Sequence, residues 1–536
     1  MIWICVTQDV DTGEVQCHTE ASTLAPLVRE YDQIIGHNII GFDAPVLRKV
    51  WSIGIPKSKA VDTLILSRLL NPVQDGGHSL KNWGKLLRNN KIDFEVEDFD
   101  NGLTEEMREY CIQDVALTRD LYKYLMEELG KWKNSEQSIL LEHAVAVECI
   151  KQEHNGFKLD VPKAQVLRAS FADRMGVLED TVQAEFPPIV EERWSEKTGK
   201  RLKDKVTVFN LASRKQIADR LQSLGWKPNK HTEKGQPIVD EGTLEDIDIP
   251  EAKMIAEYLM LQKRVGLIDS WLKHVDENTD RVHGRIITNG TITGRMSHHS
   301  PNMGQIPSVT KPYGTEIRSL WTVDAGHRLI GTDLAGIELR CLSHYMQDDD
   351  WQEELLNGDI HQKNADAAGI TRPQAKTLIY ATLYGAGPSK IGSIVGGGAK
   401  EGNEVLHRFY SNTPKLKRLM EKVAKVAAKG YVPGLDGRRI LVRSEHAALN
   451  SLLQGCGAII AKQWCVEAHK TLRQQGLSVQ QVAFVHDEIQ IEAEATIAEQ
   501  VAETMIKSAA EAGKVLGFRC PVDAEAKIGN NWYECH

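Results

Sequence analysis

Two apolar segments that flank three polar residues constrain the fold of this chain most strongly. Residues 481–485 and 489–492 are apolar with an alternating pattern, and His486, Asp487 and Glu488 lie between them. This pattern predicts a tight β-hairpin with its acidic residues at the tip. Charged residues at a hairpin tip are most often simply solvated, so this segment alone does not indicate a site.

A second aspartate follows another apolar strand. Residues 328–332 lead into Asp333, and a helical pattern begins shortly after it. Taken alone, Asp333 is more readily explained as a turn or helix-capping residue. Two acids delivered by adjacent strands are different, because Mg²⁺ prefers carboxylate and phosphate oxygens. A pair of such ions stabilises both the attacking and the leaving oxygen of an in-line displacement.

A helix predicted to begin near Pro373 and end before Gly385 carries an unusual stripe. Four residues spaced by four share one face of it: Arg372, Lys376, Tyr380 and Tyr384. Two cations and two aromatic rings make a poor core face. They suit a triphosphate held by the cations beneath a stacked base. The alternative is a solvated amphipathic face.

Length, charge and cysteine usage set the broad class. A chain of 536 residues is too long for one core, which suggests about three or four structural units. The net charge of −9 does not indicate nucleic-acid binding, although binding depends on local fields, and residues 413–439 are strongly basic. The nine dispersed cysteines lack a CxxC pair, which favours a reducing compartment over a zinc module. We find no membrane-spanning run and no signal peptide.

The remaining patterns predict alternating elements first and helices afterwards. A hairpin over 2–18, a helix over 21–29, a strand at 33–35 and a helix after Asp43 indicate an α/β domain. We predict helices over these ranges: 136–153, 163–186, 213–223 and 250–274. The polar segment 187–205 is predicted to be a loop. Strands return after 282, with helical stretches at 350–430 and 445–474.

The three segments around Asp333, Lys376 and Asp487 resemble motifs A, B and C of family A DNA polymerases, in the same order and at similar separations. The resemblance covers nearly the whole chain and is strongest to the replicative polymerases of T-seven-type podophages. Further matching runs are 209–214, 289–295, 302–307, 357–361, 434–438, 446–450 and 531–536.

The resemblance implies an α/β and α+β multidomain fold. An RNase H-like 3′–5′ exonuclease-type domain, lacking its first strand, would occupy residues 1–130. A right-hand polymerase would follow, with a mostly helical thumb at 131–285 and fingers at 351–430. The palm would be formed by 286–350 and 431–536.

The resemblance also implies a role for each matching position. A DNA-directed DNA polymerase would extend a primer with dNTPs, using two Mg²⁺ ions held by Asp333, Asp487 and the backbone carbonyl of Leu334. Glu488 and Lys376 would join the catalytic group. The residues expected to bind the nucleotide are His361, Arg372, Lys376, Tyr380 and Glu338, of which Glu338 would exclude ribonucleotides by steric clash. Those expected to contact DNA are Arg295, Gln305, Arg438, Gln454 and His486.

The N-terminal region resembles the second and third motifs of DEDD-type 3′–5′ exonucleases. The matching residues are Asp43 in 36–43 and Tyr110 and Asp114 in 110–114. The first motif, an Asp-x-Glu on the opening strand, is not found; residues 9–11 are a poor substitute because they lie in a predicted hairpin turn. We therefore expect proofreading to be absent or weak. Either the natural start lies upstream of Met1, or the domain is a structural remnant.

The resemblance carries expectations about partners. Primer-template DNA is expected, with a helicase-primase and a single-strand binding protein, in the cytoplasm of an infected bacterial host. Thioredoxin is not expected, because the related polymerases bind it through a long thumb insertion and only the short segment 187–205 stands there. Three alternatives are a single-subunit RNA polymerase, a catalytically inactive DNA-binding protein and a repair polymerase. Glu338 and the exonuclease-like domain favour DNA synthesis over RNA synthesis.

Overall fold

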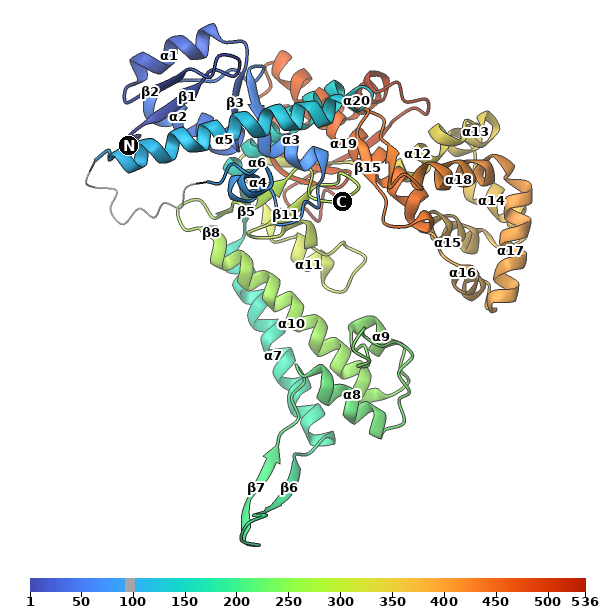
Figure 1. Cartoon of the computed structure of the whole chain (residues 1–536). Helices are drawn as coiled ribbons and strands as arrows, with labels where there is room; N and C mark the ends of the chain where they lie inside the picture. Colours follow the sequence, from blue (N-terminus) through green and yellow to red (C-terminus); the bar gives the residue numbers. More distant parts are fainter. Residues whose placement is uncertain (92–101) are drawn as a thin grey trace. The chain divides into compact units, whose positions relative to one another are not determined.

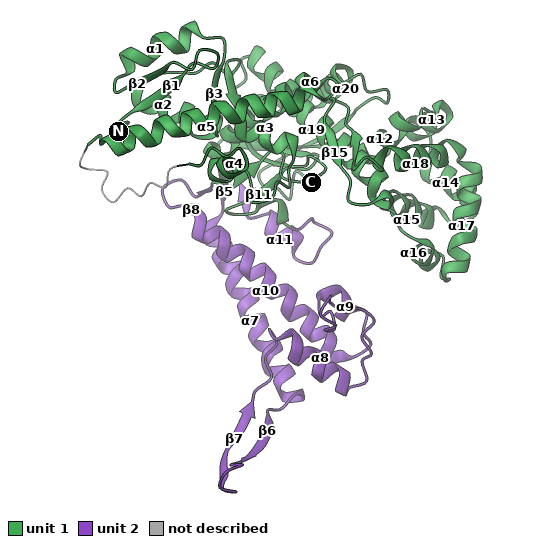
Figure 2. Cartoon of the chain, in the orientation of Figure 1, with its two compact units in different colours: residues 1–157, 283–306, 323–536 green, residues 158–282, 307–322 purple. Residues whose placement is uncertain are grey.

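The computed structural model describes residues 1–91 and 102–536, which form two compact units (Figures 1 and 2). Unit 1 comprises residues 1–157, 283–306 and 323–536, and unit 2 comprises residues 158–282 and 307–322. The chain therefore leaves unit 1, forms most of unit 2, and returns.

The N-terminal part of unit 1 is an α/β domain, as predicted. Its elements are β1 (Cys5–Gln8), β2 (Val15–His18), α1 (Ala21–Glu30), β3 (Ile34–Gly36), the π-helix η1 (Ile39–Asp43), α2 (Ala44–Trp51), β4 (Ala60–Asp62), α3 (Thr63–Leu70), α4 (Leu80–Leu86) and α5 (Glu105–Gly130). Strands β1 and β2 form the predicted hairpin, and β3 pairs in parallel with β4. Among the described strands these two pairs remain separate sheets, and α5 packs against both β1 and β3.

Helix α5 is the longest helix of this domain and packs against β1, β3, α3 and α4. The side chain of Thr104 accepts a hydrogen bond from the backbone N–H of Met107 and so caps the helix start. Leucines spaced by four then form one buried face: Leu117, Leu121, Leu125 and Leu129. Part of this face packs on Leu66 and Trp83. The long helix is therefore held by burial along one side.

The sheet that carries both predicted catalytic strands lies in the C-terminal part of unit 1. Its order is β16-β17-β13-β18, and each neighbouring pair is antiparallel. The strands are β13 (His327–Leu334), β16 (Val479–Val485), β17 (Glu488–Glu494) and β18 (Ala524–Gly529). Helix α20 (Ala498–Val515) packs against β18, β13 and β17, and α19 (Ala448–Gln474) packs on α20. The predicted strand before Asp333 and the predicted hairpin around Asp487 are both confirmed.

The rest of unit 1 is mainly helical. Its elements are α6 (Ser135–Asn155), β10 (Arg285–Ile287), β11 (Ser297–His299), η3 (Met303–Gln305), α12 (Ile337–Met346), α13 (Asp349–Asn357), α14 (Ile360–Ala368), α15 (Arg372–Leu383), α16 (Pro388–Ile394), α17 (Ala399–Asn412), α18 (Pro414–Ala427), β14 (Tyr431–Pro433), β15 (Arg439–Leu441), η4 (Glu445–Ala447) and η5 (Ala495–Ile497). Helices α13 to α18 gather in one lobe (Figure 1). One hydrophobic core runs from this lobe through α19 to the sheet, so the two are packed as one body.

Unit 2 is built on the long helices α7 and α10, which lie side by side (Figure 2). Its elements are β5 (Phe157–Leu159), α7 (Val161–Glu185), β6 (Ile189–Trp194), β7 (Arg201–Thr207), α8 (Arg214–Ser223), α9 (Glu241–Glu245), α10 (Pro250–His274), β8 (Val275–Asp276), β9 (Arg281–Val282), α11 (Gly314–Arg318) and β12 (Trp321–Thr322). All the helices predicted over 163–274 are present. No described helix is long and apolar enough to cross a membrane.

The prediction of a loop over 187–205 is wrong. This segment forms the antiparallel ribbon β6–β7, which projects from the end of α7 (Figure 1). Both faces of the ribbon are exposed, so neither face shows the run of apolar residues by which a half-buried strand is recognised. Cross-strand pairs define it instead, for example the ion pair between Glu191 and Lys205 at 3.0 Å.

Candidate active site

Strand pairing brings Asp333 and Asp487 to one edge of the sheet. Asp333, near the end of β13, lies opposite Glu488 in the β13–β17 register. The backbone N–H of Leu334 donates to the carbonyl of Asp487 at 3.1 Å. His486 and Asp487 form a two-residue turn in which His486 has a φ of 60°, as the tightest hairpin turns require. The two aspartates therefore stand on rigid, directly neighbouring backbone.

The two aspartates are electrostatically strained. Burial, followed by the charges of Asp487 and Glu488, raises the pKa of Asp333 to about 7. Burial also raises the pKa of Asp487, although the nearby Arg295 and His486 oppose the rise. Each carboxylate is thus held where its own negative charge is disfavoured. A bound cation would relieve both.

The donor set fits Mg²⁺. Among the described residues, no group of three or more His, Cys, Asp or Glu side chains could hold a metal by itself. Mg²⁺ is commonly held by one or two carboxylates together with substrate phosphates and water. Asp333 and Asp487 supply such a pair of oxygen ligands, so the site suits an ion that arrives with a phosphate-bearing substrate.

Glu488 is placed differently from the two aspartates. It is buried, with 8% of its surface exposed. Its Oε1 accepts hydrogen bonds from Gln490, at 2.7 Å, and from the indole of Trp532, and its Oε2 lies 3.6 Å from Nδ1 of His536. These contacts fix the Glu488 carboxylate beside Asp333.

The predicted stripe lies on α15, which begins at Arg372. Arg372 and Lys376 are exposed and Tyr380 is half-buried. Nε of Arg372 donates to Asp359 at 2.6 Å. His361, on the neighbouring helix α14, has its pKa lowered by burial and then by the charges of Arg372 and Lys376. The structure therefore gathers three nitrogen-bearing side chains that can bind an anion.

Glu338 connects this helix to the catalytic strand. It lies in the first turn of α12, which follows Asp333. The hydroxyl of Tyr384 donates to Oε1 of Glu338 at 2.9 Å, and Nη2 of Arg295 lies 3.6 Å from the same oxygen. Burial, followed by the hydrogen bond to Glu338, raises the pKa of the Tyr384 hydroxyl, and Gln454 on α19 lies close enough to oppose this rise. Glu338 is thus held from two sides, by Arg295 and by Tyr384, the residue that follows α15.

The residues predicted to contact DNA divide into two groups. Arg295 and Gln454 lie beside Glu338 and Tyr384, as described above, and His486 is exposed at the hairpin tip. Gln305 is exposed at the end of η3. These four positions are open to a ligand or border the carboxylates.

Arg438 does not belong with them. It is 2% exposed, and its guanidinium is bound to Asp436 and to Glu142 of α6. Lys462 of α19 also pairs with Glu142, at 2.5 Å. This buried network contradicts the prediction that Arg438 contacts DNA, because breaking such a network leaves a charge buried without a partner.

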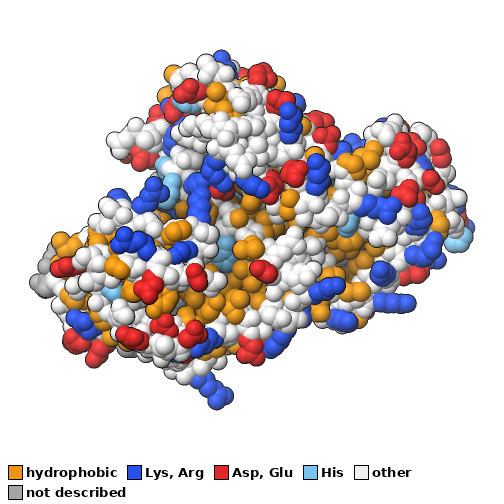
Figure 3. Space-filling model, turned by 90° about the horizontal axis from the view of Figure 1, so that it is seen from above, with side chains coloured by type: hydrophobic (Ala, Val, Ile, Leu, Met, Phe, Trp, Pro, Cys, Tyr) orange, Lys and Arg blue, Asp and Glu red, His pale blue; other side chains and the backbone are white. Residues whose placement is uncertain are grey.

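The basic stretch 413–439 is only partly free. Arg438 is buried, Arg439 packs over the rings of Trp132 and Tyr431, and Lys415 pairs with Asp348 at 3.2 Å. The exposed cations lie on α18 or just after it: Lys417, Arg418, Lys422, Lys425 and Lys429. Figure 3 shows basic side chains along the lobe that holds α13 to α18, with acidic ones among them.

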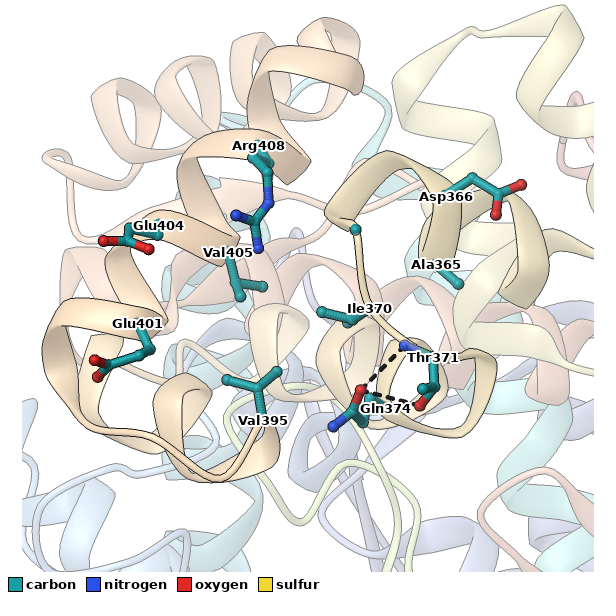
Figure 4. A pocket seen from close by; sticks show the side chains of 11 residues that line it. Ala365, Asp366, Ile370, Thr371, Gln374, Val395, Glu401, Glu404, Val405 and Arg408 are labelled. Atoms are coloured by element: carbon teal, nitrogen blue, oxygen red, sulfur yellow. Dashed lines mark hydrogen bonds between the residues drawn. The ribbon is translucent and has the colours of Figure 1, made fainter.

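A cavity of about 560 Å³ in the same lobe is separate from this site (Figure 4). It lies between α14, α15 and α17, and its polar lining includes Gln374, Glu401, Glu404 and Arg408. None of the residues predicted to bind metal, nucleotide or DNA lines it.

In the N-terminal domain, two of the three predicted exonuclease residues, Tyr110 and Asp114, share the partner Lys91. Asp43 ends η1, and burial followed by the charge of Asp62 raises its pKa to about 6. Nζ of Lys91 pairs with Oδ2 of Asp114 at 2.7 Å and lies 4.6 Å from the ring centre of Tyr110. The charge of Asp114 is therefore already neutralised by a lysine.

Sequence reasoning missed several partners of these residues. Lys91, Asp359 and Trp532 each hold a predicted residue in place. Asp359 lies in a run that resembles the polymerases, so its position was noticed but its role was not. Trp532 likewise lies in the matching run 531–536, but its contact with Glu488 was not foreseen. Lys91 carried no local signal, because its partner Asp114 is distant in sequence.

The comparisons with known proteins agree with this geometry. The family model of DNA polymerase family A matches residues 189–534, and that of the 3′–5′ exonuclease matches residues 5–130. The DNA-directed DNA polymerases of Enterobacteria phage T3 and Escherichia phage T7 are each 33% identical to the chain, over 94% of it and 92% of their own length.

More distant relatives share the same architecture. DNA polymerase I of Aquifex aeolicus is 27% identical, over 98% of this chain and 92% of its own. The solved POL domain of Pol1 from M. smegmatis, in complex with DNA primer-template and dNTP, aligns with a TM-score of 0.80 at 18% identity, over 99% of this chain and 95% of that one.

The two family models define a nucleotide polymerase with an exonuclease-type domain ahead of it. The chain belongs to DNA polymerase family A. The predicted fold class is confirmed.

The charge strain at Asp333 makes a testable difference to stability. We expect Asp333→Asn to raise the thermal midpoint of the metal-free protein above about pH 7, with the difference shrinking towards about pH 5. The folded-state pKa of about 7 exceeds that of a free aspartate, about 3.9, so the wild type loses stability as the pH rises through this window. Added Mg²⁺ should stabilise the wild type more than the variant.

Thermal unfolding across this pH range in EDTA measures the effect. Asp173→Asn, at an exposed position of α7, is the control. Equal pH dependence in the wild type and Asp333→Asn would contradict the account of strained carboxylates.

Proposed function

We propose that this chain is a template-directed DNA polymerase that extends a primer from dNTPs by two-metal phosphoryl transfer. The observation that carries the proposal is the meeting of Asp333 and Asp487 on adjacent backbone, with raised pKa values. Helix α15, which presents Arg372 and Lys376, belongs to the same compact unit. Phosphoryl transfer depends mainly on positioning and charge stabilisation.

The two aspartates and the backbone carbonyl of Leu334 would hold two Mg²⁺ ions. When bound, the ions would stabilise the attacking and leaving oxygens. Glu488 orients the acidic edge, since its own carboxylate is held by Trp532 and Gln490. We assign Lys376 to the catalytic group for two reasons. It makes no ion pair among the described residues, and its positive charge is one of the causes that lower the pKa of His361.

The nucleotide would lie along α15. His361, Arg372 and Lys376 would bind the triphosphate, which requires Arg372 to exchange its contact with Asp359 for phosphate. Tyr380 would stack on the incoming base. Glu338 would crowd the 2′ position of the sugar, and its hydrogen bond to Tyr384 keeps the carboxylate in place for that role.

The DNA would be contacted by Arg295, Gln305, Gln454 and His486, and its backbone by the exposed cations of α18. We place the activity in phage DNA replication in the cytoplasm of a bacterial host, on the basis of the phage T3 and T7 relatives. Helicase-primase and single-strand binding proteins are the partners proposed for that setting. We propose no dependence on thioredoxin.

Removing the Glu338 carboxylate tests the choice of sugar. The wild-type protein should extend a labelled primer with dNTPs and scarcely with rNTPs. Glu338→Ala should raise the ratio of ribonucleotide to deoxyribonucleotide incorporation roughly 10- to 200-fold, as expected when one steric conflict is relieved. The measurement is kcat/KM for single-nucleotide addition.

Two further variants sharpen this test. Tyr384→Phe keeps the carboxylate but loses its hydrogen bond, so it should loosen selection less than Glu338→Ala does. Glu404→Ala, at an exposed position of α17, should leave the ratio unchanged. Wild-type protein that incorporates rNTPs and dNTPs equally well would favour the RNA polymerase alternative.

We also propose that the 3′–5′ exonuclease activity is weak, because Lys91 neutralises Asp114 where a metal would be needed. A labelled single-stranded oligonucleotide with Mg²⁺ and no dNTPs should shorten at a rate near background, and Asp114→Ala should change that rate little. Rapid Mg²⁺-dependent shortening that disappears in Asp114→Ala would overturn this proposal.

A further inference from the structure

The ribbon β6–β7 of unit 2 has no evident structural purpose. In the described structure it pairs with no other strand. Its apolar side chains are largely exposed: Ile189 47%, Val190 57%, Trp194 57%, Leu202 43% and Val206 57%. An isolated two-stranded ribbon is only marginally stable in water. Such a projection is best explained by something that binds it.

The apolar residues do not form one docking face. Val190 pairs with Val206 and Trp194 pairs with Arg201, whereas Leu202 pairs with Arg193. Because successive side chains of β6 alternate between faces, Val190 and Trp194 share one face, and Val206 lies there as the partner of Val190. A register shift between Glu191 and Arg193 makes Leu202 the partner of Arg193, so Leu202 lies on the other face. The exposed apolar side chains are therefore divided between two faces and do not form one large patch of the kind that marks a protein interface.

Ion pairs neutralise some of the ribbon's cations but not all of them. Lys205 pairs with Glu191, and Arg201 pairs with Asp204 at 3.1 Å and with Glu192 at 3.5 Å. The tip lysines are exposed and have no ion pair among the described residues: Lys197, Lys200 and Lys203. The whole ribbon, residues 189–207, carries six cations and four carboxylates, a net charge of +2 in a chain whose net charge is −9.

We propose that the β6–β7 ribbon is a DNA-binding element whose tip lysines, Lys197, Lys200 and Lys203, contact the phosphate backbone of duplex DNA. The inference rests on the proposed polymerase function and adds a binding surface to it. A lysine that neutralises a phosphate releases a condensed counterion, so the contact is independent of base sequence. A two-stranded ribbon is also narrow enough to enter the major groove.

This contact should slow the release of DNA. Its contribution is separate from the chemistry, because the ribbon carries no residue of the proposed active site. The ribbon would therefore increase the number of nucleotides added per binding event without changing the rate of each addition.

The test compares two triple variants of the full chain. The first replaces Lys197, Lys200 and Lys203 with Ala. The control replaces three exposed lysines in the segment that follows α8 of the same unit: Lys227, Lys230 and Lys234. The probe is a fluorescein-labelled primer-template duplex of mixed sequence. Kd is measured by anisotropy across a range of salt concentrations, together with single-nucleotide addition at saturating DNA.

The tip variant should show a shallower dependence of log Kd on log salt, by about 0.9 per lysine and about 2.7 in all. Over a fourfold rise in salt it should therefore lose about 40-fold less affinity than the wild type. Its thermal midpoint and its rate of single-nucleotide addition should match those of the wild type. The control variant should keep the wild-type slope.

Each other outcome overturns the inference. An unchanged salt slope in the tip variant excludes phosphate contacts by these lysines. An equal reduction in the control variant shows a general charge effect. An unchanged slope, combined with loss of binding to a protein, assigns the ribbon to a protein partner. If the wild type binds DNA but never extends the primer, the proposed polymerase function fails, and the salt slopes still decide separately whether the ribbon contacts DNA.

Discussion

The hydrogen-bonded register between β13 and β17 is the constraint on which the rest of the site depends. It places Asp333 opposite Glu488, and the bond from Leu334 to Asp487 ties the hairpin turn to the end of the neighbouring strand. A slip of one residue would turn every side chain of the strand to the opposite face. The meeting of two carboxylates thus follows from backbone pairing, which the core beneath the sheet locks in place.

This backbone holds charges that repel one another, and their surroundings are arranged to accept a charged substrate. Negative charge is disfavoured at the acidic edge, while α15 and α14 gather Arg372, Lys376 and His361, of which Arg372 is paired with Asp359. A metal-bound triphosphate is the substrate that we propose for these two groups of residues. The hydrogen bond from Tyr384 to Glu338 links the end of α15 to the start of α12, the helix that follows Asp333. Such strain at a functional site commonly lowers stability.

The strand and the hairpin that carry Asp333 and Asp487 could be predicted from sequence because their signals are local. The strand before Asp333, the hairpin around Asp487 and the stripe on α15 each show a periodicity within a few residues. Arg438 was misjudged because Glu142, which buries it, lies far away in sequence on α6. Lys91 escaped notice for the same reason. The ribbon β6–β7 was missed because an exposed strand leaves no apolar alternation to detect.

The most direct test of the central claim is to count the divalent ions held by the complex. The complex contains wild-type protein, a dideoxy-terminated primer on its template and the next correct dNTP. Electron paramagnetic resonance should count two Mn²⁺ ions bound per chain in this complex, after the Mn²⁺ bound by free dNTP is subtracted. The variant carrying Asp333→Asn and Asp487→Asn should bind the same DNA but neither of these ions. Retention of both ions by that variant would show that other residues hold the metals, and the account of this site would be wrong.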